Sequence, residues 1–112
     1  MKGRIVLVPF PFDDLSGVKV RPAVCVTEAV TVHRHVVIAY VSSVVPPQLL
    51  ASDLVLDPAD PDFRQSGLQV RSVVRLHRLA TVRTRLFIRQ LGELSSRHLA
   101  QADEHLKHVF GI

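Results

Sequence analysis

Apolar residues occur along most of the chain in short runs that have the length and composition of β-strands. The runs are rich in β-branched residues and are bounded by Pro, Gly and Asp, which favour turns. Polar and apolar residues alternate over Asp53–Asp57, as they do in a half-buried strand. The expected strands are Arg4–Phe10, Ala23–Thr27, Val36–Val45, Asp53–Asp57 and Ser72–Leu76, with Leu86–Leu91 as a further one.

The period of the apolar residues changes near the C-terminus. Ser95 can cap a helix there, because a serine hydroxyl accepts a hydrogen bond from a free backbone N–H of the first turn. The apolar residues that follow fall on one face of a helix ending at Gly111; they are Leu99, Ala102, Leu106, Val109 and Phe110. Short strands closed by one amphipathic helix predict a mainly β fold, a small antiparallel β-barrel with a C-terminal α-helix.

The length and composition restrict the class of protein. A chain of 112 residues, 47% of them hydrophobic, is enough for one compact core, so we expect a single domain over residues 1–112. No apolar stretch approaches the ~18–20 residues that span a bilayer, and no cleavage site follows the first apolar run, so we expect no membrane association and a cytoplasmic location. Cys25 is the only cysteine, which excludes an internal disulfide and a thiolate metal cage.

The whole chain has a formal net charge of +4, and its basic residues are concentrated in the second half. Residues 1–63 contain five Lys and Arg against seven Asp and Glu, whereas residues 64–112 contain nine against three. The segment from Phe63 to Gly92 has no acidic residue and contains Arg64, Arg71, Arg75, Arg78, Arg83, Arg85 and Arg89. Such a run attracts polyanions. Charge alone leaves open a nucleic acid, a solvated basic face or the carboxylates of a partner protein.

Three segments of the sequence resemble one protein family. They read GRIVLVPFPFDDLSGVKVRPAVCV near the N-terminus, SVVRLHRLATV in the middle and IRQLGELSSRHLAQADEHLKHVFGI at the end. Together they look like the PemK/MazF toxins of bacterial type II toxin–antitoxin modules, and the likeness runs nearly end to end. The resemblance implies an SH3-like β-barrel, a homodimer and an endoribonuclease that cleaves single-stranded RNA (mRNA) at short sequences without a metal or other cofactor. It also implies a cognate antitoxin as protein partner.

Arg21-Pro22 stands before the second apolar run. Pro22 restricts Arg21 to an extended conformation and has no N–H, so the pair suits the beginning of a strand, where an arginine often only caps the edge. Metal-independent RNA cleavage uses the substrate 2′-hydroxyl as nucleophile and needs a base, an acid and donors for the charge on the phosphorane. Because a guanidinium stays charged and forms two parallel hydrogen bonds to phosphate, the resemblance makes Arg21 the first catalytic candidate.

Ser42-Ser43 ends the third expected strand, where the family usually has Thr followed by Thr or Ser. Serines at a strand end more often form turns, so their assignment rests on the resemblance. A hydroxyl there can hydrogen-bond a phosphate or the attacking oxygen. We therefore expect Ser42 to be catalytic and Ser43 to bind substrate.

His77 stands where the family often has an acidic residue proposed for proton transfer. Imidazole can accept the 2′-hydroxyl proton or donate one to the leaving group, and the neighbouring charges of Arg75 and Arg78 favour its neutral, base form. The sequence therefore predicts His77 as the acid/base and Arg75 as its electrostatic partner, with Lys19 and Arg78 binding the RNA backbone.

The missing acid also supports an alternative. The chain can be a weakened or inactive toxin-like barrel that binds RNA or an acidic antitoxin segment without cleavage.

Other candidate residues have simpler explanations. Cys25 lies inside an apolar run, as a core residue does, and the His105 and His108 spacing has no third ligand arranged with it, so we expect no metal site.

Overall fold

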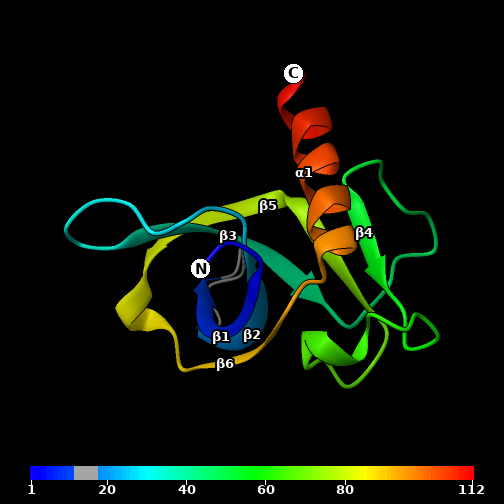
Figure 1. The fold of residues 1–112 in the computed structure, drawn as a ribbon, viewed down its shortest axis with the longest axis horizontal. Coiled ribbons are helices and arrows are strands. Elements are labelled where there is room, and N and C mark those ends of the chain that lie inside the picture. Colours follow the sequence, from blue (N-terminus) through cyan, green and yellow to red (C-terminus); the bar gives the residue numbers. More distant parts are fainter. Residues whose placement is uncertain (12–17) are drawn as a thin grey trace.

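The computed structural model describes residues 1–11 and 18–112. Figure 1 shows the arrangement of its elements. The strands are β1 (Arg4–Pro11), β2 (Val18–Cys25), β3 (His35–Ser42), β4 (Asp53–Leu56), β5 (Ser72–Arg83) and β6 (Arg89–Glu93). The helices are η1 (Arg64–Ser66), η2 (Thr84–Leu86) and α1 (Ser96–Phe110), of which the first two are single 3₁₀ turns. The predicted mainly β fold with a C-terminal helix is confirmed.

The strands form one antiparallel sheet in the order β4-β5-β3-β2-β1-β6. The long strand β5 is bulged, because Tyr40 of β3 lies opposite Arg75 whereas the preceding Ala39 lies opposite Leu79. Residues 76–78 therefore have no partner in β3, and such a bulge bends a strand and increases its twist. The sheet curls into a half-barrel whose edges are β4 and β6 (Figure 1).

Each face of the sheet carries its own apolar cluster. The inner cluster joins the sheet to α1 and to the segment before β5; its members include Ile5, Val24, Val41, Leu54, Leu56, Phe63, Val74, Leu76, Leu94 and Ala102. The outer cluster packs against Ala80, Val82 and Phe87 and contains Val6, Val8, Ala23, Cys25, Val36, Ile38 and Tyr40. Burying both faces of a sheet explains why its central strands are nearly continuous apolar runs rather than alternating ones.

Two glycines hold η1 against the edge strand β6. A Cβ atom on Gly67 would lie 2.0 Å from the carbonyl oxygen of Leu91, and one on Gly92 would lie 2.3 Å from that of Gln65. Gly67 also has a φ of +73°, a conformation that other residues rarely adopt. The two backbones can approach only because both side chains are absent. This contact closes part of the gap between the sheet edges.

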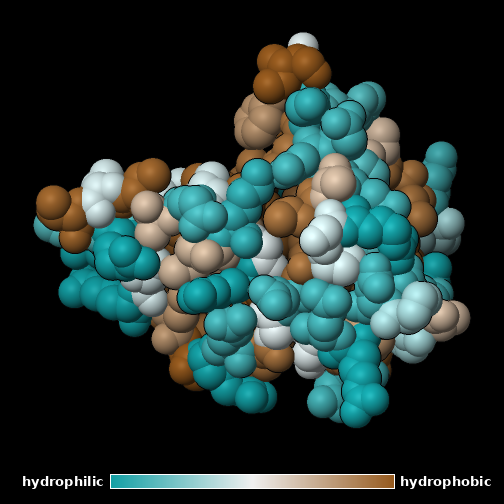
Figure 2. Space-filling view, in the orientation of Figure 1, coloured by the Kyte–Doolittle hydropathy of each residue, from teal (hydrophilic) through white to brown (hydrophobic). Residues whose placement is uncertain are grey.

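Helix α1 begins and ends as the sequence predicts. The Ser95 hydroxyl accepts a hydrogen bond from the His98 N–H at 3.0 Å, and Gly111 ends the helix with a φ of +70°. In the part of the chain that the structure describes, no helix is long and apolar enough to cross a membrane. Apolar side chains gather at the free end of α1, at the top of Figure 2, where Phe110 and Ile112 are exposed.

The strand boundaries differ from the expected ones in two places that matter for the site. β2 begins at Val18 rather than at Ala23, so Arg21-Pro22 lies within the strand and not at its beginning. β3 ends at Ser42, so the last three residues of the expected run to Val45 lie outside it. β5 extends to Arg83, and η2 takes the place of the first residue expected in the last strand.

Candidate functional site

A cavity of about 360 Å³ opens where β2 and β3 separate. The pairing of these two strands ends at Ala23 and Tyr40, although both strands continue by two or more residues. Pro22, the next residue of β2, has no N–H with which to continue the ladder. The strands therefore part between Arg21-Pro22 on one side and Val41-Ser42 on the other, and all four of these residues line the cavity.

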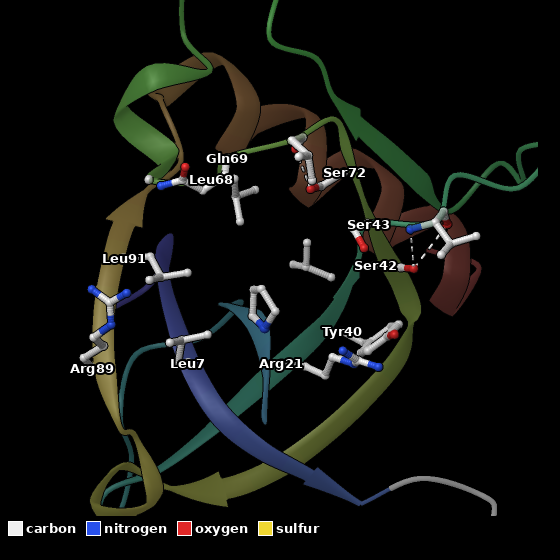
Figure 3. Close-up of a pocket in the computed structure, with 15 residues that line it drawn as sticks. Leu7, Arg21, Tyr40, Ser42, Ser43, Leu68, Gln69, Ser72, Arg89 and Leu91 are labelled. Atoms are coloured by element: carbon white, nitrogen blue, oxygen red, sulfur yellow. Dashed lines mark hydrogen bonds between the residues drawn. The ribbon is translucent and has the colours of Figure 1, made fainter. Parts of the chain in front are cut away.

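One side of the cavity is polar, and the other carries leucines together with Gln69 and Arg89 (Figure 3). Arg21, Tyr40, Ser42 and Ser43 lie together on one side, and the Leu7, Leu68, Leu91, Gln69 and Arg89 side chains lie across from them and above. The register explains this division, because Arg21, Tyr40 and Ser42 occupy the outer face of the sheet, whereas Leu7, Pro22 and Val41 continue the inner face.

Arg21 is held in β2 opposite Val8 of β1, and its side chain is half-buried. Its aliphatic stem can pack against the wall while the guanidinium stays at the polar side of the cavity. A charged fork beside hydroxyl groups is an arrangement that binds a phosphate. The side chain that the sequence predicts as the main anion ligand therefore lines the cavity.

The two serines differ in what their hydroxyls already bind. The Ser42 Oγ accepts from the Val44 N–H at 3.1 Å and donates to the Val44 carbonyl at 3.2 Å, so it also forms the turn after β3. Ser43 is exposed, and its hydroxyl forms no hydrogen bond with the described residues. Both serines line the cavity. Ser43 is the more available donor for an anion.

Arg75 has a different partner from the one predicted. Its Nε atom lies 2.7 Å from the Asp53 Oδ1 atom, and the Asp53 side chain is fully buried while that of Arg75 is 21% exposed. The second carboxylate oxygen of Asp53 accepts from the Leu50 N–H at 2.9 Å. A buried carboxylate is tolerated when it is paired and hydrogen-bonded. Arg75 thus compensates the buried Asp53 carboxylate.

The remaining predicted residues lie outside the cavity lining. His77, on the bulge of β5, is exposed, and its Nδ1 atom is 3.0 Å from the Ser52 hydroxyl. The Arg78 guanidinium lies over the Tyr40 ring, 4.6 Å from its centre, in a cation–π contact. Lys19 is exposed on β2. The structure therefore brings Arg21, Ser42 and Ser43 together, and it does not bring Lys19, Arg75, His77 or Arg78 into the same cavity.

Sequence reasoning missed four polar residues of the cavity, namely Tyr40, Gln69, Ser72 and Arg89. A signal existed for Tyr40, since it precedes Ser42 by two residues on one strand and must share its face. Arg89 belongs to the acid-free segment, but its position opposite Leu7 depends on the pairing of β1 with β6. Gln69 has no local signal, because the Gly67 turn places it.

Cys25 is confirmed as a core residue. It is fully buried in the outer cluster. Burial raises the pKa of its thiol to about 11, because a thiolate is poorly solvated among apolar side chains. The thiol is therefore protonated at neutral pH and is not a nucleophile.

The chain matches the family model of PemK-like, MazF-like toxins of type II toxin–antitoxin systems over residues 1–110. The chain belongs to this family, and the predicted family membership is confirmed. None of the curated protein sequences compared with the chain matches it significantly.

Solved structures of MazF toxins have the same fold. The chain is similar to Mycobacterium tuberculosis toxin MazF-mt6, with 22% identity, a TM-score of 0.68 and coverage of 96% of this chain and 97% of that chain. A MazE–MazF structure from Deinococcus radiodurans matches with 22% identity, a TM-score of 0.72 and coverage of 98% and 94%. A mycobacterial endoribonuclease in complex with its cognate antitoxin matches with 15% identity, a TM-score of 0.70 and coverage of 100% and 95%.

Proposed function

We propose that this toxin-family protein is a metal-independent endoribonuclease that cleaves single-stranded RNA. The observation that carries the proposal is the cavity in which the Arg21 guanidinium and the Ser42 and Ser43 hydroxyls line one side. Family membership supports an RNA substrate, because a solved structure of the same fold is an endoribonuclease. A fixed positive charge beside hydroxyl donors suits a phosphodiester that gains negative charge during the reaction.

The proposed reaction is an internal transfer of the phosphoryl group. The 2′-oxygen of a ribose attacks the adjacent phosphorus and loses its proton to a base, while the bond from phosphorus to the 5′-oxygen breaks and that oxygen receives a proton. The products are a 2′,3′-cyclic phosphate and a 5′-hydroxyl end. Arg21 stabilises the negative phosphorane oxygens, and Ser42 and Ser43 hydrogen-bond the phosphate or the attacking oxygen.

The first test is incubation of the purified protein with a long single-stranded RNA in EDTA. We expect discrete cuts whose new 3′ ends are cyclic phosphates. Because one positioned donor for developing charge typically contributes ~10²–10³-fold, Arg21→Ala is expected to slow cleavage by about that factor. Arg34→Ala, at an exposed arginine of the β2–β3 connection, is the matched control and should cleave at the wild-type rate. Intact RNA with the wild-type protein would contradict the proposal.

His77 is proposed as the acid/base, supported by its place in the family pattern and by the exposure of its ring. General acid/base catalysis typically contributes ~10²-fold or more, so His77→Ala should lower the single-turnover rate by at least that factor. His33→Ala, at an exposed histidine on another part of the surface, is the control. A rate for His77→Ala within about threefold of wild type would exclude the role, since it falls well below that contribution.

The alternative function is a barrel that binds RNA or an acidic segment without cleaving it. It is favoured by the ion pair of Arg75 with the buried Asp53 carboxylate, which gives Arg75 a structural role. Expression in bacteria distinguishes the two functions. A ribonuclease toxin arrests growth and Arg21→Ala restores it, whereas the binding protein shows no such difference.

We also infer that the chain forms a homodimer and binds a cognate antitoxin. The support is family membership together with the solved neighbours that contain an antitoxin. Sedimentation of the purified chain, alone and with the protein encoded by the adjacent gene, checks both inferences. A monomer that does not bind that protein would contradict them.

A further inference from the structure

The cavity contains more than a phosphate site, because leucines line much of its second half, where the exposed Arg89 and Gln69 are the polar residues. Leu7, Leu68 and Leu91 line the half that lies across from the two serines (Figure 3). Leu68 and Leu91 pack against the inner cluster, and Leu7 lies on the inner face of β1; these apolar side chains offer nothing to an anion. A ligand that fills the whole cavity therefore has a charged part and a flat or rounded apolar part. A nucleotide has both, in a phosphate and a base.

The size of the cavity favours a single nucleobase over an extended peptide as its ligand. Its volume of about 360 Å³ lies at the lower end of the ~300–1,000 Å³ range of small-molecule sites. Single-stranded RNA is recognised mostly through bases that have left the stack and enter such sites one at a time. An extended peptide would instead need a groove along several residues.

The wall that carries Leu68 and Gln69 is held rigidly. The preceding residue, Gly67, is fixed by its close approach to Leu91. The buried Ser66 hydroxyl donates to the Phe63 carbonyl at 2.6 Å and accepts from the Leu68 N–H at 3.2 Å. The site is therefore shaped before a ligand arrives, which reduces the entropy lost on binding.

Gln69 stands on this wall with its amide group available. Its side chain is exposed, lines the cavity and forms no hydrogen bond with the other described residues. A glutamine amide offers a donor and an acceptor side by side, and this pair matches the edge of adenine. In unstacked RNA the Watson–Crick and Hoogsteen edges are both free for such contacts.

We propose that this cavity is a subsite for one unstacked nucleobase next to the cleaved phosphate, and that Gln69 determines which base it accepts. The leucines contact the faces of the base, and the Gln69 amide hydrogen-bonds its edge. Arg21 and the serines bind the phosphate of the same nucleotide. The inference rests on the proposed ribonuclease function, and it adds the residue that sets sequence preference.

The first experiment compares cleavage maps of a long single-stranded RNA, obtained by sequencing the new 5′-hydroxyl ends. Gln69→Glu has nearly the same shape but replaces the amide donors with an acceptor. A bidentate pair discriminates between bases by about tenfold, so the preference at one position beside the cut should change by that factor while cleavage continues. Gln69→Ala should weaken the preference at the same position. Gln101→Glu, on the exposed side of α1, is the matched control and should give the wild-type map.

The second experiment does not depend on cleavage. Each of the four nucleoside 3′-monophosphates is added to the ¹⁵N-labelled chain, and amide chemical shifts are recorded. We expect one nucleotide to perturb the Leu68 and Gln69 amides most strongly, and Gln69→Ala to weaken its binding. Unchanged cleavage maps in both Gln69 variants would overturn the subsite. So would a titration in which none of the four nucleotides changes the chemical shifts of the Leu68 and Gln69 amides. A wild-type chain that does not cut RNA but binds one nucleotide here would overturn the ribonuclease function alone.

Discussion

Arg21 and Arg75 lie on the same face of the sheet, on either side of Tyr40, yet their surroundings give them different roles. Arg21 is half-buried at the polar side of a cavity, where its charge can meet a ligand. Arg75 lies opposite Tyr40 and Asp53 on neighbouring strands and compensates the buried Asp53 carboxylate. Residue type alone does not separate a ligand-binding arginine from a structural one. The ion pair with the buried Asp53 carboxylate identifies Arg75 as structural.

This difference predicts a loss of stability rather than of chemistry for Arg75→Ala. Removing one partner of a buried pair leaves an uncompensated charge and typically costs about 3–5 kcal/mol in the free energy of unfolding. Arg71 is the matched control, because its pair with Asp57 is about half exposed on both sides, and Arg71→Ala should cost less than about 1 kcal/mol. Urea denaturation measures both variants. Equal stability losses would contradict the structural role of Arg75.

At the scale of elements, the contact between η1 and β6 depends on two glycines. Gly67→Ala adds a Cβ that would collide with the Leu91 carbonyl, and the φ of +73° adds strain. We expect a loss of about 3 kcal/mol or more in the free energy of unfolding.

The C-terminal cap of α1 provides the control for this variant. Gly111 has nearly the same φ, +70°, but a Cβ there would meet nothing within 4 Å. Gly111→Ala should therefore cost only the conformational strain, about 1 kcal/mol. Thermal unfolding of the two variants separates collision from strain. Similar losses would show that the backbone contact contributes little.

A second connection between elements joins α1 to the segment after β4. Arg97 binds both Asp60 and Asp62, and the buried His98 places its Nε2 atom 3.3 Å from the Asp60 carboxylate. The hydrogen bond from Arg97 is the main cause that lowers the pKa of Asp60 from 3.8 to about 2. The segment that leads to η1 and the cavity wall is thereby attached to the helix.

The lowered pKa predicts how this connection responds to acid. Because the folded pKa of Asp60 lies below the unfolded value, its contribution to stability is fully present above about pH 4 and is lost as the pH falls toward 2. The difference in melting temperature between the wild-type chain and Asp60→Asn should therefore shrink across this range. A difference that stays constant from pH 5 to pH 2 would contradict the assignment.

At the scale of the whole molecule, the acid-free segment supplies both structural and free positive charge. Among its arginines, Arg71 and Arg75 form ion pairs and Arg78 covers an aromatic ring. The other four form no ion pair with the described residues; they are Arg64, Arg83, Arg85 and Arg89. The basic surface available to a polyanion is therefore smaller than the sequence count suggests, and only Arg89 of these lines the cavity.

The sequence by itself determined the strands, the capped helix and the family. These features depend on residues close together in the chain, such as the Ser95 cap, the Gly111 end and the apolar runs of the central strands. The anion-binding candidates Arg21, Ser42 and Ser43 also came from the sequence, but through its resemblance to the PemK/MazF family. Their local signals, a proline and a strand end, are equally typical of structural residues.

Only the tertiary structure decided which of the candidates meet. The bulge of β5 removes His77 and Arg78 from regular pairing, and the buried Asp53 engages Arg75 from a neighbouring strand. Gln69 enters the cavity because two glycines distant in sequence let η1 and β6 touch. Register, bulges and backbone contacts between distant segments leave no periodic pattern in the sequence. For this reason the sequence did not predict the leucine-lined half of the site, which forms only when the sheet curls.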